Sequence, residues 1–191
     1  KSMADKAGVL LFVDEVQTGI GRTGKLFAHE WAKIQPDIMA VAKGLGGGFP
    51  VGACLANEKT TKTMAPGTHG STFGGNPLAS AAANAVLDIV LDDGFLDNVQ
   101  RKGIYFNNQL TLIAAKHKFL GDIRGQGLLV GVGCDNSVVN LDIVKEAETR
   151  GLLTVPAGNN VIRLIPPLII TEAEIDEGLS LFDQACDNVS R

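Results

Sequence analysis

Residues 41–52 read VAKGLGGGFPVG and join two apolar runs, at residues 38–42 and 51–56. Lys43 is the one charged residue in this segment, and five glycines follow it up to Gly52. Short apolar runs bounded by glycine are typical of buried strands. The segment therefore predicts a strand, a loop and a second strand, with a single amine at the carboxyl end of the first strand.

Further strands and helices are predicted around this unit. Residues 9–13 form a continuous apolar run, which is typical of a strand buried on both faces, and Asp14 follows it. Residues 23–34 have the pattern of an amphipathic helix that ends before Pro36. Strands that alternate with helices predict an α/β domain with a largely parallel sheet.

The second half of the chain has a different pattern. One long helix is predicted to begin at Pro77, and another is predicted over residues 95–118, with a break between them at Gly94. We place a domain boundary there, so that residues 1–93 belong to one domain and residues 94–191 form a connecting helix and a small α+β domain. This small domain is predicted to begin with a glycine-rich strand at residues 123–134 and a helix at residues 141–150. Two short strands follow at residues 152–155 and 161–164, and a last helix with a capping box begins at Thr171.

The composition excludes several classes of partner. The net charge is −4 and the basic residues are scattered, which predicts no nucleic-acid surface. No apolar run approaches the ~18 residues of a membrane span. Cys54, Cys134 and Cys186 are far apart and odd in number, which predicts reduced thiols in a cytoplasmic protein. Neither the cysteines nor the histidines have the spacing of metal ligands, so no metal site is expected.

A nucleotide site is one interpretation of residues 19–24, GIGRTG. They match the dinucleotide pattern G-x-G-x-x-G, and with Lys25 they approach a P-loop. A P-loop continues with Ser or Thr, where this chain has Leu26, and a dinucleotide turn has its first glycine directly at the strand end. Here the acidic Asp14 and Glu15 follow the strand and repel phosphate. We therefore interpret the segment as a glycine-rich turn.

Asp14 and Lys43 each follow a predicted strand. If the strands are parallel, both side chains lie at the sheet edge where ligands of α/β proteins bind. A simple ion pair is one interpretation. Another is catalytic, because a desolvated lysine forms Schiff bases with carbonyls, and a carboxylate keeps the ring nitrogen of pyridoxal phosphate protonated. The glycines after Lys43 leave room for a bulky cofactor.

Four segments in order resemble the class III, pyridoxal-phosphate-dependent aminotransferases. They read DEVQTGIGRTG, PDIMAVAKGLGGGFPVGA, HGSTFGGNPLASAAA and IRLIPPLIIT, at residues 14–24, 36–53, 69–83 and 162–171. The resemblance covers essentially the whole chain. It implies an α/β protein of fold type I, in which residues 1–93 are part of the large cofactor-binding domain and residues 94–191 include the small C-terminal domain.

The resemblance also implies roles for residues near the cofactor. Lys43 would form the Schiff base and then carry the proton between substrate and cofactor. Asp14 would face the ring nitrogen, Val16 would pack on the ring, and Gln17 would lie near the phenolic oxygen. A structural role remains open for Gln17, whose amide could instead satisfy backbone groups of the turn.

Three further residues match family positions. Ser71 and Thr72 would reach the cofactor phosphate from the neighbouring subunit of a homodimer, and Arg163 would bind the substrate carboxylate. A helix cap before Pro77 is another interpretation of the two hydroxyls, although Asn76 suits that position better. Arg163 lies in an apolar strand and needs an anionic partner, which could also be an acidic side chain.

Within this family the four segments resemble the acetylornithine aminotransferases. The implied reaction transfers the amino group of N-acetylornithine, or of succinyl-diaminopimelate, to 2-oxoglutarate in arginine or lysine biosynthesis. Ornithine and 4-aminobutyrate enzymes share most of the motifs and remain alternatives. Because the chain opens with KSMADKAGVLLFVDE, which has the pattern of a helix end followed at once by a central strand, we expect a fragment of a longer protein. Such a fragment would bind the cofactor poorly by itself, or would act only as an assembly module.

Overall fold

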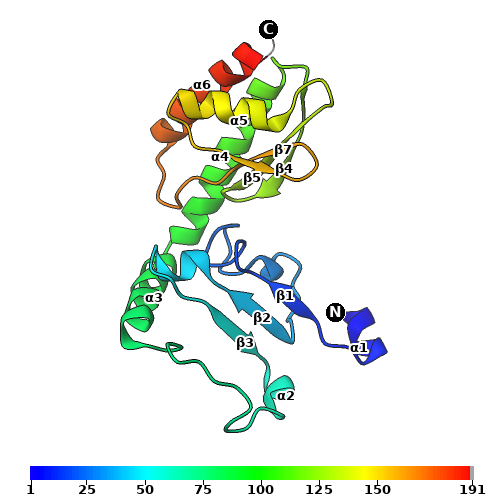
Figure 1. Cartoon of the computed structure of the whole chain (residues 1–191), viewed down its shortest axis with the longest axis vertical. Helices are drawn as coiled ribbons and strands as arrows, with labels where there is room; N and C mark the ends of the chain where they lie inside the picture. The colour runs from blue at the N-terminus through cyan, green and yellow to red at the C-terminus, as the bar shows by residue number, and fades with distance from the viewer. Residues whose placement is uncertain (190–191) are drawn as a thin grey trace. The chain divides into compact units, whose positions relative to one another are not determined.

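The chain divides after Leu96 in the computed structural model. One compact unit is Lys1–Leu96 and the other is Asp97–Arg191, and residues 1–189 are described. The first unit contains a three-stranded sheet and the second a four-stranded sheet (Figure 1). No helix within residues 1–189 is long and apolar enough to cross a membrane.

The sheet of the first unit has the order β1-β2-β3, with β1 at Phe12–Asp14, β2 at Ile38–Val41 and β3 at Ala53–Ala56. Strands form in all three predicted segments, although β1 begins at Phe12 and not at Val9. β1 and β2 are parallel, whereas β3 runs antiparallel to β2. The antiparallel pairing follows from the short glycine-rich connection, because a parallel neighbour needs a crossover of a dozen or more residues.

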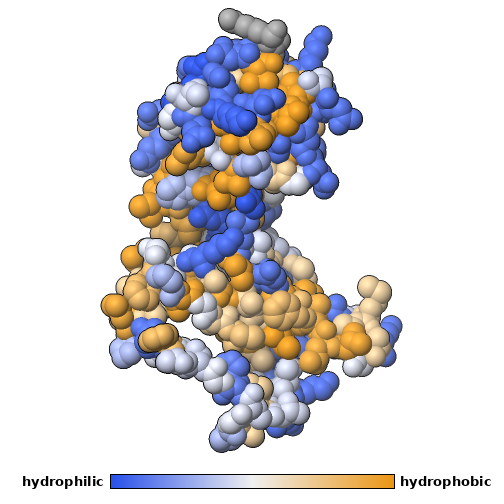
Figure 2. All heavy atoms as spheres, in the orientation of Figure 1, coloured by the Kyte–Doolittle hydropathy of each residue, from blue (hydrophilic) through white to orange (hydrophobic). Residues whose placement is uncertain are grey.

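Burial of this sheet differs from the sequence prediction. The β1 segment was expected to be buried on both faces, but Phe12 is 53 % exposed and every residue of β3 is exposed. Apolar side chains consequently lie on the visible surface around these strands (Figure 2). Among the described residues only one face of β2 is packed, where Met39 and Val41 join Ile20 in the core. Within residues 1–189, the apolar side chains of β1 and β3 are therefore largely unburied.

The prediction of a helix at residues 23–34 is wrong. Only a single turn of 3₁₀ helix, η1 at Ala28–Glu30, forms there. Gly24 and Lys33 have φ values of +84° and +52°, which α-helices do not contain. The first amides of η1 are bonded to a distant carboxylate rather than to the preceding turn, so a local helical pattern is overridden by a tertiary contact.

Helix α3, Pro77–Val90, completes the core of the first unit with Val90. The Asn76 Oδ1 accepts the Ala79 N–H at 3.0 Å and caps this helix, as the sequence predicts. The hydroxyls of Ser71 and Thr72 therefore do not serve as its N-cap. The remaining short helices of the first unit are α1 at Ser2–Ala7, η2 at Lys43–Gly46 and α2 at Glu58–Thr61.

The second unit consists of three helices and an antiparallel sheet of order β4-β5-β7-β6 (Figure 1). Its helices are α4 at Phe95–Ala114, α5 at Asn140–Thr149 and α6 at Glu172–Val189. Its strands are β4 at Leu120–Gln126, β5 at Leu129–Cys134, β6 at Val155–Ala157 and β7 at Val161–Leu164.

Two local features of the second unit can be compared with the sequence. The single strand predicted at residues 123–134 is instead a hairpin, because Gly127 has φ of +58° and turns the chain between β4 and β5. The capping box at the start of α6 is confirmed. The Thr171 N–H donates to Glu174 Oε2 at 2.7 Å, and the Glu174 N–H donates to Thr171 Oγ1 at 3.2 Å.

Two helical glycines of this unit are expected to respond oppositely to alanine. A Cβ at Gly103 of α4 would lie 2.6 Å from the Gly127 carbonyl oxygen, so Gly103→Ala should lower the free energy of unfolding by about 2 kcal/mol. A Cβ at Gly178 of α6 would lie 3.6 Å from Leu152, an ordinary contact, so Gly178→Ala should raise it by about 0.5–1 kcal/mol. Urea unfolding measures both. Equal midpoints for Gly103→Ala and the unsubstituted chain would contradict the close approach of α4 to the hairpin.

Candidate active site

The parallel pairing of β1 and β2 brings two reactive groups to one edge of the sheet. Asp14 is the last residue of β1 and lies opposite Ala40 in the register. Lys43 lies two residues beyond Val41, the last residue of β2. Because the carboxyl ends of parallel strands share an edge, a carboxylate and an amine are presented from neighbouring strands of one unit.

Asp14 and Lys43 do not form the ion pair that a purely structural interpretation requires. Within residues 1–189 the ion pairs join other groups. The Asp14 Oδ1 accepts the Val16 N–H at 2.9 Å, which fixes the direction of the carboxylate. Both side chains are exposed, so desolvation of the amine would have to come from groups beyond these residues.

The backbone of Lys43 is in the left-handed region, with φ of +46°. This conformation costs a residue with a Cβ roughly 1–2 kcal/mol. It allows the chain to leave β2 and enter η2 at once, with Gly47 also left-handed at the end of that turn. Strained backbone of this kind concentrates at functional sites, and here it falls on the lysine that the sequence motifs single out.

Val16 and Gln17 lie on the turn that follows Asp14, and both are half-buried. The Gly19 N–H donates to the Glu15 carbonyl at 3.0 Å and closes this turn. A Cβ at Gly19 would lie 2.8 Å from the same carbonyl oxygen, so the turn needs glycine at this position. The first unit therefore presents Asp14, Val16 and Gln17 on one short turn next to the strand edge that carries Lys43.

Glu15 is a buried polar residue for which the sequence motifs predict no role. It is 1 % exposed, although its neighbour Asp14 is exposed. Its carboxylate accepts the N–H groups of Ala28 and His29 at 3.0 and 2.8 Å, and it also accepts the Thr18 hydroxyl. The sequence does carry one signal of this buried carboxylate. Glu15 directly follows Asp14 at the strand end, and neighbouring side chains of a strand point to opposite faces, so only one of the two can face the exposed edge.

The other predicted site residues lie elsewhere in the chain. Ser71 and Thr72 are exposed on the connection between α2 and α3, where the Ser71 Oγ accepts the Gly74 N–H at 2.9 Å. Arg163 belongs to the second unit. It is half-buried in the middle of β7, opposite Gly131 of β5 and Val155 of β6.

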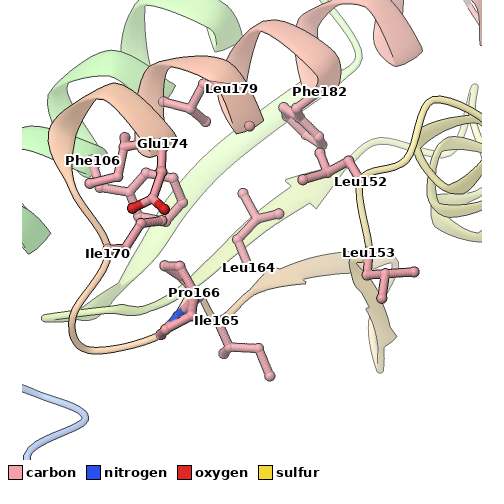
Figure 3. A pocket seen from close by; sticks show the side chains of 13 residues that line it. Phe106, Leu152, Leu153, Leu164, Ile165, Pro166, Ile170, Glu174, Leu179 and Phe182 are labelled. Carbon is pink, nitrogen blue, oxygen red and sulfur yellow. The ribbon is translucent and has the colours of Figure 1, made fainter.

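A cavity of about 260 Å³ lies within the second unit. Its walls are mostly apolar and include Phe106, Leu152, Leu164 and Phe182 (Figure 3). The Glu174 carboxylate also lines it, but this group is bonded at the start of α6. Apart from this bonded carboxylate, the lining residues of the cavity carry no nucleophile or general base, and we assign the reactive groups to the edge of the first sheet.

Comparison with known proteins places the chain in a family. The sequence model of the family described as Aminotransferase class-III matches residues 1–186. The acetylornithine aminotransferase of Mesorhizobium japonicum is 55 % identical over 183 residues, which are 94 % of this chain and 45 % of that protein. The acetylornithine aminotransferase of Bacillus subtilis is 50 % identical over 185 residues, 97 % of this chain and 47 % of that protein. The chain thus spans about half the length of these relatives.

Solved structures agree with this placement. The N-acetylornithine aminotransferase of Stenotrophomonas maltophilia has a TM-score of 0.87 and 36 % identity, over 98 % of this chain and 49 % of that one. The ornithine aminotransferase of Toxoplasma gondii has a TM-score of 0.91 and 36 % identity, over 99 % of this chain and 46 % of that one. The α/β architecture is that of the fold type I transferases, and the chain belongs to the class III aminotransferase family.

Proposed function

We propose that the protein carrying this chain is a pyridoxal-phosphate-dependent aminotransferase that moves the amino group of N-acetylornithine to 2-oxoglutarate, in arginine biosynthesis. The observation that supports this most is the shared edge of β1 and β2, which presents Asp14 and Lys43 together. The amino-acid sequence identity of 50–55 % to acetylornithine aminotransferases favours N-acetylornithine as the substrate. Transfer from ornithine is the second candidate, because solved ornithine aminotransferases have TM-scores of 0.90 and 0.91 to this chain.

The residues at this edge fit pyridoxal phosphate. The cofactor requires an amine for its aldehyde, an anion for its ring nitrogen and space for a flat ring. Lys43 would hold it covalently, and Asp14, whose direction is fixed by the Val16 N–H, would face the ring nitrogen. Val16 and Gln17 would contact the ring and its phenolic oxygen from the same turn. When bound, the cofactor withdraws electrons from the substrate α-carbon.

Each protein group then has a distinct task. The Lys43 amine would hold the cofactor and would take up and return the proton of the substrate α-carbon. The Asp14 carboxylate would balance the positive charge of the ring nitrogen. Arg163 would hold the substrate carboxylate by two parallel N–H donors, which orients the α-carbon.

We also propose a homodimeric, cytoplasmic enzyme in which Ser71 and Thr72 reach the cofactor phosphate of the neighbouring subunit. Their exposed position on the connection before α3 supports a role outside their own unit. Residues 1–93 would be part of the large domain, and residues 94–191 would form the connecting helix and the small domain. The division of the chain after Leu96 is close to this proposed boundary.

The test uses a protein of the family's full length that contains this chain. After incubation with pyridoxal phosphate and borohydride reduction, peptide mass mapping should find a pyridoxyl adduct on Lys43. The rate constant kcat/KM should then be highest for N-acetylornithine among N-acetylornithine, ornithine and 4-aminobutyrate. Absence of any adduct on Lys43 would refute the cofactor assignment, and a preference for ornithine would select the second candidate.

Arg163→Lys is expected to weaken binding of the substrate carboxylate. An ammonium keeps the charge but loses the two parallel donors, so KM should rise about ten- to a hundredfold with a smaller change in kcat. Steady-state kinetics with N-acetylornithine measure this. Arg124→Lys is the control, because Arg124 is an exposed arginine on β4 of the same sheet. An unchanged KM for Arg163→Lys would assign Arg163 to a structural role.

A further inference from the structure

We propose that Glu15 is the positioning residue of the cofactor-binding edge. Its buried carboxylate ties the turn of residues 14–19 to η1 and thereby fixes the directions of Asp14 and Gln17. This inference rests on the proposed function, since it concerns how the same edge is held for pyridoxal phosphate. It assigns a task to a residue that itself would not touch the reacting atoms.

The first step of the argument is the direction of the side chain. The Glu15 N–H still donates to the Ala40 carbonyl at 2.9 Å, so the backbone at this residue continues the pairing of β1 with β2. Side chains alternate along a strand, and Glu15 therefore points away from the side that Asp14 faces. The measured burial agrees, with Asp14 exposed and Glu15 1 % exposed.

The second step is the set of donors around the carboxylate. Oε1 accepts the His29 N–H at 2.8 Å and lies 3.2 Å from His29 Nδ1. Oε2 accepts the Ala28 N–H at 3.0 Å and the Thr18 hydroxyl. A buried carboxylate is costly unless donors surround it, and here both oxygens are bonded. Removing the acceptor would leave two part-buried backbone N–H groups without their partner.

The third step is what these bonds connect. Ala28 and His29 lie 13 and 14 residues after Glu15 in the chain. The carboxylate therefore closes the loop between them, which contains the GIGRTG segment. Gly21 and Gly24 in that segment have φ values of +81° and +84° and bond to each other within the loop. The glycine pattern thus serves a closed loop rather than a nucleotide phosphate.

The last step links this loop to Asp14. The bond from the Val16 N–H to Asp14 Oδ1 exists only while residues 14–19 keep their turn. Thr18 belongs to that turn and donates directly to Glu15, so the turn is held from its buried side. When this hold is lost, Asp14 and Gln17 are free to change direction, and the fit to the cofactor weakens.

The experiment compares Glu15→Gln with Glu30→Gln in the full-length protein. Glutamine keeps the shape of the Glu15 side chain. It replaces one of the two accepting oxygens with an NH₂ group, which donates and cannot accept from the surrounding donors. Glu30 is the matched control, because its exposed carboxylate accepts one N–H, from Phe27 at 2.7 Å, in the same loop. The readouts are the dissociation constant of pyridoxal phosphate, the absorbance spectrum at saturating cofactor and the urea midpoint. Thr18→Val, which removes one donor, is a milder second variant should Glu15→Gln not fold.

We expect Glu15→Gln to weaken cofactor binding about tenfold or more and to change the cofactor spectrum at saturation, as substitutions behind a ligand-holding residue do. Thr18→Val should shift both in the same direction by less, and Glu30→Gln should shift neither. A variant with a lower urea midpoint but an unchanged dissociation constant and spectrum would overturn the positioning role. The two proposals can fail separately. Absence of an adduct on Lys43 in the unsubstituted protein would refute the proposed function together with the role of Glu15, whereas an adduct with unchanged cofactor binding in Glu15→Gln would refute the role of Glu15 alone.

Discussion

Lys43→Ala should reduce transamination by at least about ten-thousandfold. The substitution removes the amine that we propose anchors the cofactor and moves the α-proton, and a positioned base alone contributes up to about 10⁴ in rate. The pyridoxyl adduct should disappear from the peptide that contains residue 43. Single-turnover kinetics with N-acetylornithine and peptide mass mapping measure the two losses independently.

Lys33→Ala is the control for this loss. Lys33 is an exposed lysine of the same unit, and its φ of +52° resembles the +46° of Lys43. Removal of a lysine side chain from left-handed backbone is thus matched between the two variants, whereas the chemistry is not. Normal activity in Lys33→Ala is expected. A Lys43→Ala enzyme that keeps more than a few per cent of activity would show that another residue carries the cofactor.

Asp14→Asn should lower kcat/KM about a hundredfold or more. The amide has nearly the shape of the carboxylate, and its oxygen can still accept the Val16 N–H that Asp14 Oδ1 accepts at 2.9 Å. What is lost is the negative charge that we propose faces the ring nitrogen, and loss of one preorganised electrostatic contact typically costs 10²–10³ in rate. Steady-state kinetics with N-acetylornithine and 2-oxoglutarate measure the loss.

Asp135→Asn controls for the local geometry of Asp14→Asn. Asp135 directly follows β5, and its Oδ1 accepts the Ser137 N–H, two residues later, at 2.8 Å. The two aspartates therefore have the same kind of bond at a strand end, but only Asp14 is proposed to face the cofactor. Similar losses in both variants would mean that the strand-end turn, and not the charge, is what the enzyme needs.

Local chemistry accounts for what could be predicted from the sequence. The strands at β1, β2 and β3 follow from apolar runs bounded by glycine and charge, and the N-caps at Asn76 and Thr171 follow from short-range bonds within four residues. The shared edge of Asp14 and Lys43 also follows, since it needs only the parallel pairing of β1 with β2.

The remaining features depend on contacts between distant residues. Residues 23–34 have a helical pattern, yet the Glu15 carboxylate takes the amides of Ala28 and His29 from 13 and 14 residues away. No periodicity contains that information. Gly103 is another case, because its need for glycine arises from the Gly127 carbonyl across the packed hairpin and not from its own helix. The bonding of Glu15 is a third case, because the sequence does not show that its carboxylate meets Ala28 and His29.

The left-handed backbone at Lys43 also bears on how this protein can be engineered. Ranking positions by backbone geometry alone would recommend glycine at residue 43, because glycine adopts φ of +46° without steric cost. That choice would exchange the amine that we propose to be catalytic for thermal stability, an instance of the stability–activity trade-off. Lys33 has equivalent geometry and no proposed part in the chemistry. Stabilising libraries for this enzyme should therefore sample glycine or asparagine at residue 33 and keep residue 43 fixed.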